Sequence, residues 1–112
     1  MIIDWSDGAL AETARRYGPD ARVWKLVSDS EGCGCAMNGV PSFWLIDSPD
    51  PDDIGARSNG GLTVVYEKRH EVFFDDRMKV TFDPDKRAFK LASDGQIYSN
   101  RLRLEDRRKA SR

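Results

Sequence analysis

Residues 22–29 read Arg-Val-Trp-Lys-Leu-Val-Ser-Asp, and their alternation of polar and apolar side chains decides the class of fold. Aromatic and β-branched residues in a period-two pattern predict a strand, with Trp24 and Leu26 on its more apolar face. The next patterned segment, Ser42–Asp47, reads Ser-Phe-Trp-Leu-Ile-Asp, a short apolar run typical of a buried strand. Together the two segments indicate a domain built mainly on a β-sheet.

Shorter strands of the same kind are expected further along the chain, separated by turns that contain Asp or Gly. They cover Gly61–Lys68, Glu71–Phe74, Met78–Phe82, Ala88–Ala92 and Gln96–Tyr98. The stretch Ser48–Gly61 is rich in Pro, Asp and Gly, and its length predicts a mobile loop. Its acidic residues, like the pair Asp75–Asp76, are interpreted as solvated turn residues because no calcium-loop pattern accompanies them.

One helix is expected near the N-terminus, over residues 7–17. Ser6 or Asp7 can act as N-cap, and Gly18 followed by Pro19 is a stop signal. The face expected to be buried carries Leu10, Ala11, Ala14 and Tyr17, and it leaves Glu12, Arg15 and Arg16 outside the stripe. Several short strands with one leading helix predict an α+β fold that is mostly β, a compact sandwich or rolled sheet.

The length of 112 residues leaves room for a single domain, which we expect to cover residues 1–100. Residues 101–112 carry six Lys/Arg and two Asp/Glu, a charge of +4, so the body of the chain carries −5. This basic C-terminal tail is expected to be mobile. The overall charge of −1 argues against nucleic acid as an obligatory partner. Neither an apolar run that could span a membrane nor a signal peptide is found, so we expect a cytoplasmic protein without a membrane partner.

The segment between the first two predicted strands contains both cysteines of the chain, Cys33 and Cys35, in a Cys-Gly-Cys sequence. Glycines on either side of Cys33 and at position 39 allow sharp turns, and the glycine between the cysteines adds no Cβ that would separate the sulfurs. Thiolates are soft ligands suited to Zn, Cu(I) or an iron–sulfur cluster.

Two thiolates make an incomplete site, because a cluster or a tetrahedral zinc site normally takes four protein ligands. Completion would need a second subunit, an exogenous thiol, or oxygen and nitrogen ligands such as Asp29, Glu31 or His70. His70 is also interpreted as an ordinary hydrogen-bonded or exposed histidine. Two other interpretations of the cysteines stay open, namely small buried side chains in a tight connection and a thiol–disulfide pair.

Glu-Gly-Cys-Gly-Cys after a strand, followed by Asn-Gly-Val-Pro and a Trp-bearing strand, resembles the HesB-like group that includes the A-type iron–sulfur cluster carriers. The resemblance begins at the N-terminal helix, includes Lys-Arg-His-Glu-Val-Phe-Phe-Asp-Asp before a short strand, and ends near Ile97–Leu102. It implies a β-sandwich-like fold with a leading helix and a role in binding iron or a cluster. Typical carriers have one cysteine in the early loop and Cys-Gly-Cys near the C-terminus, whereas residues 98–102 of this chain contain no cysteine.

We therefore expect a non-enzymatic protein of the cluster assembly or carrier type, with Cys33 and Cys35 as thiolate ligands of iron or an iron–sulfur cluster. The implied partners are assembly proteins or recipient apo-proteins, and a homodimer is one way to complete the ligand set. The first alternative is a thiol–disulfide enzyme, with Cys33 as nucleophile and Cys35 as resolver. The second is an interaction module that keeps the fold and has lost cluster binding.

Overall fold

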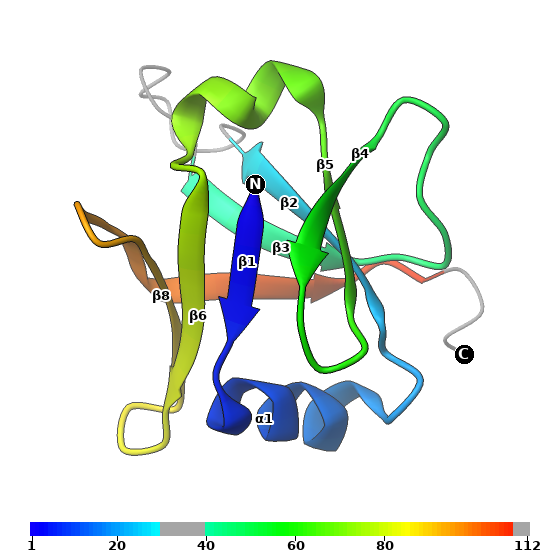
Figure 1. The fold of residues 1–112 in the computed structure, drawn as a ribbon. Helices are drawn as coiled ribbons and strands as arrows, with labels where there is room; N and C mark the ends of the chain where they lie inside the picture. Colours follow the sequence, from blue (N-terminus) through cyan, green and yellow to red (C-terminus); the bar gives the residue numbers. More distant parts are fainter. Residues whose placement is uncertain (30–39, 109–112) are drawn as a thin grey trace.

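In the computed structural model, which describes residues 1–29 and 40–108, eight β-strands close into a barrel in the order β1-β4-β5-β2-β3-β8-β7-β6 (Figure 1). The strands are β1 (Ile2–Trp5), β2 (Val23–Asp29), β3 (Val40–Leu45), β4 (Ile54–Ser58), β5 (Thr63–Tyr66), β6 (Arg77–Asp83), β7 (Ala88–Ala92) and β8 (Ile97–Asp106). They are joined by the α-helix α1 (Asp7–Tyr17) and the 3-10 helix η1 (Lys68–Phe73). No helix in these described ranges is long and apolar enough to cross a membrane.

Barrel closure depends on β1, which pairs in parallel with β4 on one side and with β6 on the other. The prediction of a mostly-β fold with one α-helix is confirmed, but the predicted sandwich or rolled sheet is a closed barrel. The predicted leading helix is likewise preceded by a strand. The sequence pattern missed β1 because the strand is only four residues long and finds both its partners more than 50 residues away in the chain.

The core lies inside the barrel and is built on aromatic side chains. Trp24 and Leu26 of β2 are fully buried there, as their place on the apolar face predicted. The Trp5 ring of β1 lies against Trp24 and Phe43, with ring centroids 6.0 Å and 5.1 Å apart. Packing of these rings therefore connects β1, β2 and β3 through the interior of the barrel.

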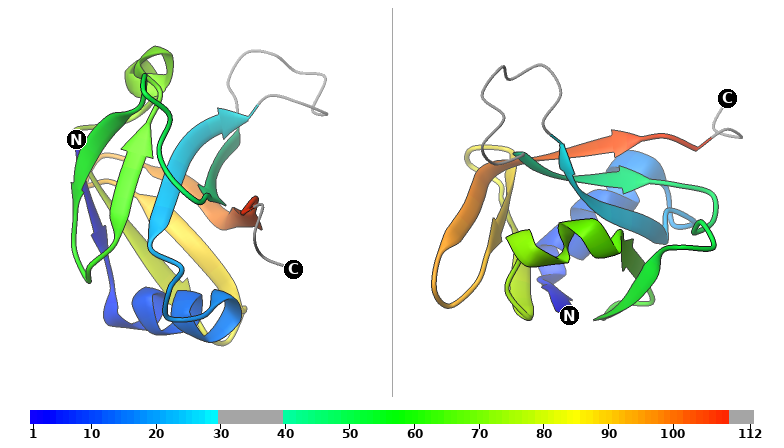
Figure 2. Two further views of the ribbon diagram at one scale, coloured as in Figure 1. Left: turned by 90° about the vertical axis from the view of Figure 1, so that its right-hand side faces the viewer. Right: turned by 90° about the horizontal axis from the view of Figure 1, so that it is seen from above.

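Helix α1 has the predicted bounds and the predicted signals at both ends. The Oγ of Ser6 accepts a hydrogen bond from the Ala9 N–H at 3.1 Å, and Gly18 ends the helix with φ +96°. The buried face is not the predicted one, because Ala9, Glu12 and Thr13 are buried whereas Ala11 and Ala14 are exposed. The helix covers one end of the barrel and contacts β6, while η1 lies at the opposite end (Figures 1 and 2). Packing against this barrel end selects the buried face of α1, and the spacing of apolar residues in the helix sequence does not.

Three downstream segments differ from the sequence predictions. The expected loop Ser48–Gly61 contains β4, which pairs antiparallel with β5 although only Ile54 and Ala56 in it are apolar side chains of any size. The expected strand Glu71–Phe74 lies largely in η1, where the chain turns over the barrel end. The expected tail from residue 101 is wrong for residues 101–106, which extend β8 and pair in parallel with β3. Of these three segments, the end of β8 takes its conformation from a strand that is distant in the sequence, whereas β4 pairs with its neighbour β5.

Candidate functional site

Strands β2 and β3 form the stem on which the cysteine-containing segment is carried. They pair antiparallel, with Ser28 opposite Pro41 and Asp29 opposite Val40, so the two ends of the intervening segment are neighbours. The end of β2 and the beginning of β3 lie at the same barrel end as η1 (Figure 2). The predicted ligands Cys33 and Cys35, and the alternative ligand Glu31, lie outside the described residues. The backbone of Asp29 is described as the last residue of β2.

His70 is the predicted site residue that the fold brings to this stem. It lies in η1, and its Nδ1 accepts a hydrogen bond from the backbone N–H of Ser28 at 3.4 Å, across 42 residues of sequence. The side chain is buried, with 8% of the residue exposed. The interpretation of His70 as a hydrogen-bonded histidine is therefore confirmed, and its role is to tie η1 to the end of β2.

The charge of His70 follows from the same surroundings. Burial lowers the pKa of His70, while the Glu67 carboxylate, 3.7 Å from Nδ1, opposes this effect and the cations Arg69 and Lys25 add to it. The ring is therefore neutral at pH 7. Because Nδ1 accepts the Ser28 hydrogen bond, the proton of the neutral ring is on Nε2, which then offers no lone pair to a metal. In this geometry His70 supports the stem instead of supplying a third ligand.

A buried ion pair stabilises the outer face of the stem. The Nζ of Lys25, in the middle of β2, lies 3.0 Å from Asp53 Oδ1 and 3.3 Å from Asp50 Oδ2. The side chains of Lys25 and Asp53 are only 9% and 2% exposed, whereas that of Asp50 is 73% exposed. Burial lowers the pKa of Lys25, but hydrogen bonds and charge from Asp53, helped by Asp50 and Glu67, outweigh it and raise the pKa overall. The interpretation of Asp53 as a solvated turn residue is therefore wrong.

The outer face of β2 and β3 is also largely buried, with Trp44 half-buried on it. Val27, directly opposite Ser42 in the ladder, is 2% exposed and Ser42 is 1% exposed. The Arg107 guanidinium lies 3.7 Å from the centroid of the Trp44 ring on this face. Ser42 Oγ and Trp44 Nε1 are buried and have no hydrogen-bond partner in the structure as described. Burial on both faces makes the stem a rigid support for the segment between its strands.

No other metal site competes with the cysteine segment in the described part of the chain. Groups of three or more His, Cys, Asp or Glu side chains that could hold a metal ion are absent from residues 1–29 and 40–108. Sequence reasoning missed the Lys25–Asp53 pair, although a lysine inside an otherwise apolar strand was a usable signal of a buried partner.

Comparison with known proteins gives matches of three kinds. A profile of the family described as iron-sulphur cluster biosynthesis matches residues 1–106. The uncharacterised protein YqkB of Bacillus subtilis (strain 168) is 32% identical over 97 residues, which cover 84% of this chain and 90% of YqkB.

Two solved structures share the fold. A Lactobacillus acidophilus protein assigned to Fe–S biosynthesis superposes with a TM-score of 0.78 and 17% identity, over 95% of this chain and 90% of that one. A Lactobacillus salivarius protein with the same assignment gives a TM-score of 0.75 and 21% identity, over 97% of this chain and all of that one. At these identities the likeness extends to the fold, including the closed arrangement of strands, and no further.

Proposed function

The chain belongs to the iron-sulphur cluster biosynthesis family, and from this premise we propose that it binds iron or an iron–sulfur cluster as cargo through Cys33 and Cys35. The observation that supports the proposal is the stem, which brings the two ends of the cysteine segment together in register and is buried on both faces. A cargo site needs a support of this kind, because ligands must be held within a few tenths of an ångström while the outer side stays open to a partner.

The donor chemistry fits an iron–sulfur cargo and fixes its stoichiometry. Thiolates are the ligands that clusters prefer, and this chain supplies two of the usual four. The hydrogen bond from Ser28 to His70 argues against the histidine as the third ligand. We therefore propose that two chains share one cluster, each contributing Cys33 and Cys35, and that the cluster passes to an apo-protein as one partner replaces the second chain.

On this proposal the protein acts as a carrier in cluster assembly and is not an enzyme. Its partners are assembly proteins and recipient apo-proteins, and its place of work is the cytoplasm, where thiols stay reduced. Partner thiolates can exchange for those of the second chain one at a time, so transfer requires no change in the oxidation state of iron.

Anaerobic reconstitution with ferrous iron and sulfide tests the proposal. We expect sulfur-to-iron charge-transfer absorbance in the visible range, about one cluster for two chains, and a shift from monomer to dimer in size-exclusion chromatography with light scattering. Cys33→Ala and Cys35→Ala should each abolish the absorbance. His70→Asn is the matched control, because His70 contacts the end of β2 next to the cysteine segment, and it should leave the absorbance unchanged.

Two results would contradict the proposal. Absence of absorbance in the wild-type protein would refute cluster binding. It would favour the thiol–disulfide alternative if titration then gave a Cys33 thiol pKa well below the usual 8.5. Full absorbance from a protein that stays monomeric would refute the sharing of one cluster by two chains.

A further inference from the structure

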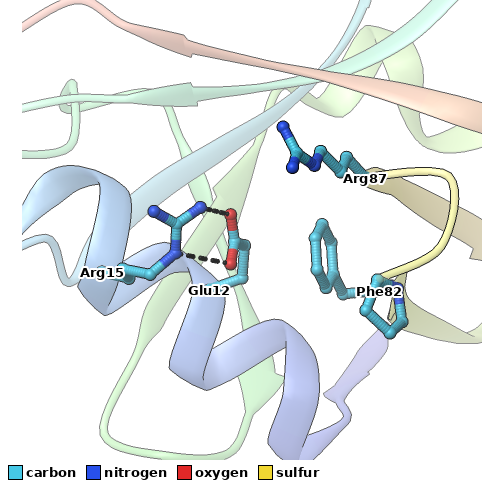
Figure 3. A pocket seen from close by; sticks show the side chains of 5 residues that line it. Glu12, Arg15, Phe82 and Arg87 are labelled. Atoms are coloured by element: carbon cyan, nitrogen blue, oxygen red, sulfur yellow. Dashed lines mark hydrogen bonds and ion pairs between the residues drawn. The ribbon is translucent and has the colours of Figure 1, made fainter.

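A pocket lies at the end of the barrel opposite the cysteine stem, between α1 and the hairpin formed by β6 and β7 (Figures 1 and 3). Its volume is about 360 Å³, which falls in the range of sites for small organic ligands. The lining consists of Glu12, Arg15, Phe82, Pro84 and Arg87. The cluster chemistry proposed above uses none of these residues.

The charges of the lining favour an anion with a single charge. Arg15 and Arg87 bring two positive charges and Glu12 one negative charge, so the pocket has a net charge of +1. Glu12 is held ionised by its own pairing, since Arg15 donates from Nε to Oε1 at 3.0 Å and Arg16 binds the second oxygen. Because Glu12 occupies Arg15, one guanidinium of the lining is left for a ligand, which matches a single carboxylate.

Arg87 is the cation left for a ligand. It is exposed, and within the described residues it has no hydrogen bond or ion pair, unlike Arg15, which is occupied by Glu12. Figure 3 shows its side chain extending over Phe82 on the side of the pocket that faces the helix. A guanidinium in this position offers two parallel donors, the geometry that a carboxylate accepts.

The backbone at Arg87 also indicates that the residue is not there for stability. Its φ is +52°, and among the described residues it is the only one other than glycine with a positive φ. Glycine or asparagine would adopt this turn conformation more easily, since the Cβ of most side chains crowds the backbone there, whereas glycine has none and asparagine can hydrogen-bond locally. The turn therefore keeps an arginine at a backbone cost, and no residue in the described ranges is bonded to its guanidinium.

The other walls are the apolar side chains of Phe82 and Pro84, and the Arg16 guanidinium lies 5.6 Å from the centroid of the Phe82 ring. Phe82 is half-buried, with its ring centroid 5.0 Å from that of Phe89, and Pro84 lies beside it in the pocket lining. An inorganic ion has no apolar group to pack against these surfaces, whereas an anion with an attached apolar group does. The geometry points to a binding site for a carboxylate that carries an apolar side chain, with Arg87 binding the carboxylate and Phe82 and Pro84 contacting the apolar group.

This chemistry is offered by a small carboxylate metabolite and equally by the C-terminal carboxylate of a partner protein that ends in an apolar residue. Binding here leaves the cysteine end of the stem uncovered. The pocket lies at the α1 end of the barrel, whereas β2 ends and β3 begins at the opposite end (Figure 1). The inference is independent of whether the cysteines hold a cluster.

NMR titration of the full-length ¹⁵N-labelled chain with N-acetylphenylalanine tests the site. We expect a dissociation constant on the order of 1 mM, the strength usual for a ligand of this size, with shifts concentrated at Arg15, Phe82 and Arg87. The neutral N-acetylphenylalaninamide should bind at least about tenfold more weakly, because it lacks the charge that the guanidinium recognises. Equal binding of acid and amide, or no binding of the acid, would overturn the inference.

Variants assign the binding to the named side chain. Arg87→Gln should weaken binding at least about tenfold, whereas the adjacent Lys86→Gln, which removes the same charge outside the lining, should change it less than about twofold. Arg87→Gly should also lose binding while its Tm stays equal or rises by about 2–4 °C, as the turn relaxes. Retained binding in either Arg87 variant would overturn the assignment.

A peptide arm separates the two sources of the ligand. An acetylated tripeptide with a free C-terminal phenylalanine is compared with N-acetylphenylalanine. Binding that is about tenfold tighter for the peptide supports a protein C-terminus, and equal binding supports a small carboxylate.

Discussion

Replacing Asp53 by asparagine should destabilise the protein far more than replacing Asp50, although both carboxylates bind the same lysine. The Asp53 oxygen lies 3.0 Å from Lys25 Nζ at a position where both side chains are less than a tenth exposed. At an effective dielectric constant of about 20, that separation corresponds to an attraction of about 5–6 kcal/mol before desolvation is subtracted. Asparagine leaves the lysine buried with one exposed partner, and we expect a loss of about 3 kcal/mol in the free energy of unfolding. Asp50→Asn should cost less than about 1 kcal/mol, because that carboxylate is 73% exposed.

Urea denaturation followed by Trp fluorescence gives the free energy of unfolding of both variants, and thermal melts give their Tm. For a chain of this length 1 kcal/mol corresponds to about 4 °C, so Tm should fall by about 12 °C for Asp53→Asn and by less than about 4 °C for Asp50→Asn. The pH dependence of the free energy of unfolding follows from the direction in which the pKa of Lys25 is shifted. The wild-type pKa of Lys25 is raised above 10.5, so the pairing is fully present below that pH and is lost as the pH rises through the folded value. Asp53→Asn removes the strongest interactions that raise the pKa of Lys25, so the difference in the free energy of unfolding between the two proteins should narrow as the pH rises past 10.5. Equal effects of the two substitutions, or a difference that does not change with pH, would refute the reasoning.

Three further predictions concern the helix, the loops and the histidine. Burial lowers the pKa of His70 below 6.5, so the unfolded chain binds more protons and the free energy of unfolding falls as the pH drops below 6.5. His70→Leu should remove that fall. It should also cost about 1–2 kcal/mol at pH 7.5, measured by urea denaturation. The hydrogen bond from an arginine lowers the pKa of Glu12 from 4.5 to about 2, so its carboxylate stabilises the fold above pH 4.5 and ceases to do so as the pH falls toward 2. Thermal melts of Glu12→Gln should therefore show a smaller loss of Tm on acidification than the wild type, and an unchanged acid dependence would contradict the pairing. Gly60 and Gly61 both have positive φ, but only at Gly60 would a Cβ meet another side chain, Leu10, at 2.6 Å. Gly61→Ala should cost about 1 kcal/mol and Gly60→Ala about 1 kcal/mol more, and calorimetry that ranks them in the opposite order would argue against this packing.

Local patterns determined the elements whose signals are contained in their own residues. The bounds of α1 followed from a capping serine and a Gly-Pro stop, and β7 was predicted with its observed bounds from five consecutive residues between turns. Strands β2 and β3 followed from alternation and an apolar run, whereas their antiparallel pairing is seen only in the structure. Cys33 and Cys35 were identified as the candidate ligands in the same way, because their residue type and spacing carry the chemistry whatever surrounds them.

Tertiary structure decided everything that depends on a partner distant in the chain. β1 is only four residues long and β4 has few apolar residues, and both become strands because closing the barrel satisfies their backbone hydrogen bonds. The same closure brings η1 to the stem, so that His70 accepts a bond from Ser28, and folds the segment before β4 over Lys25.

The sequence by itself thus determined the helix, the two central strands and the candidate thiolate ligands. Only the folded barrel decided which polar side chains are buried, which of them are paired, and where the arginine-lined pocket forms. The physical reason is that burial and pairing are properties of residues brought together across 25 to 90 positions of chain, and a pattern read along a few neighbouring residues contains no information about such contacts.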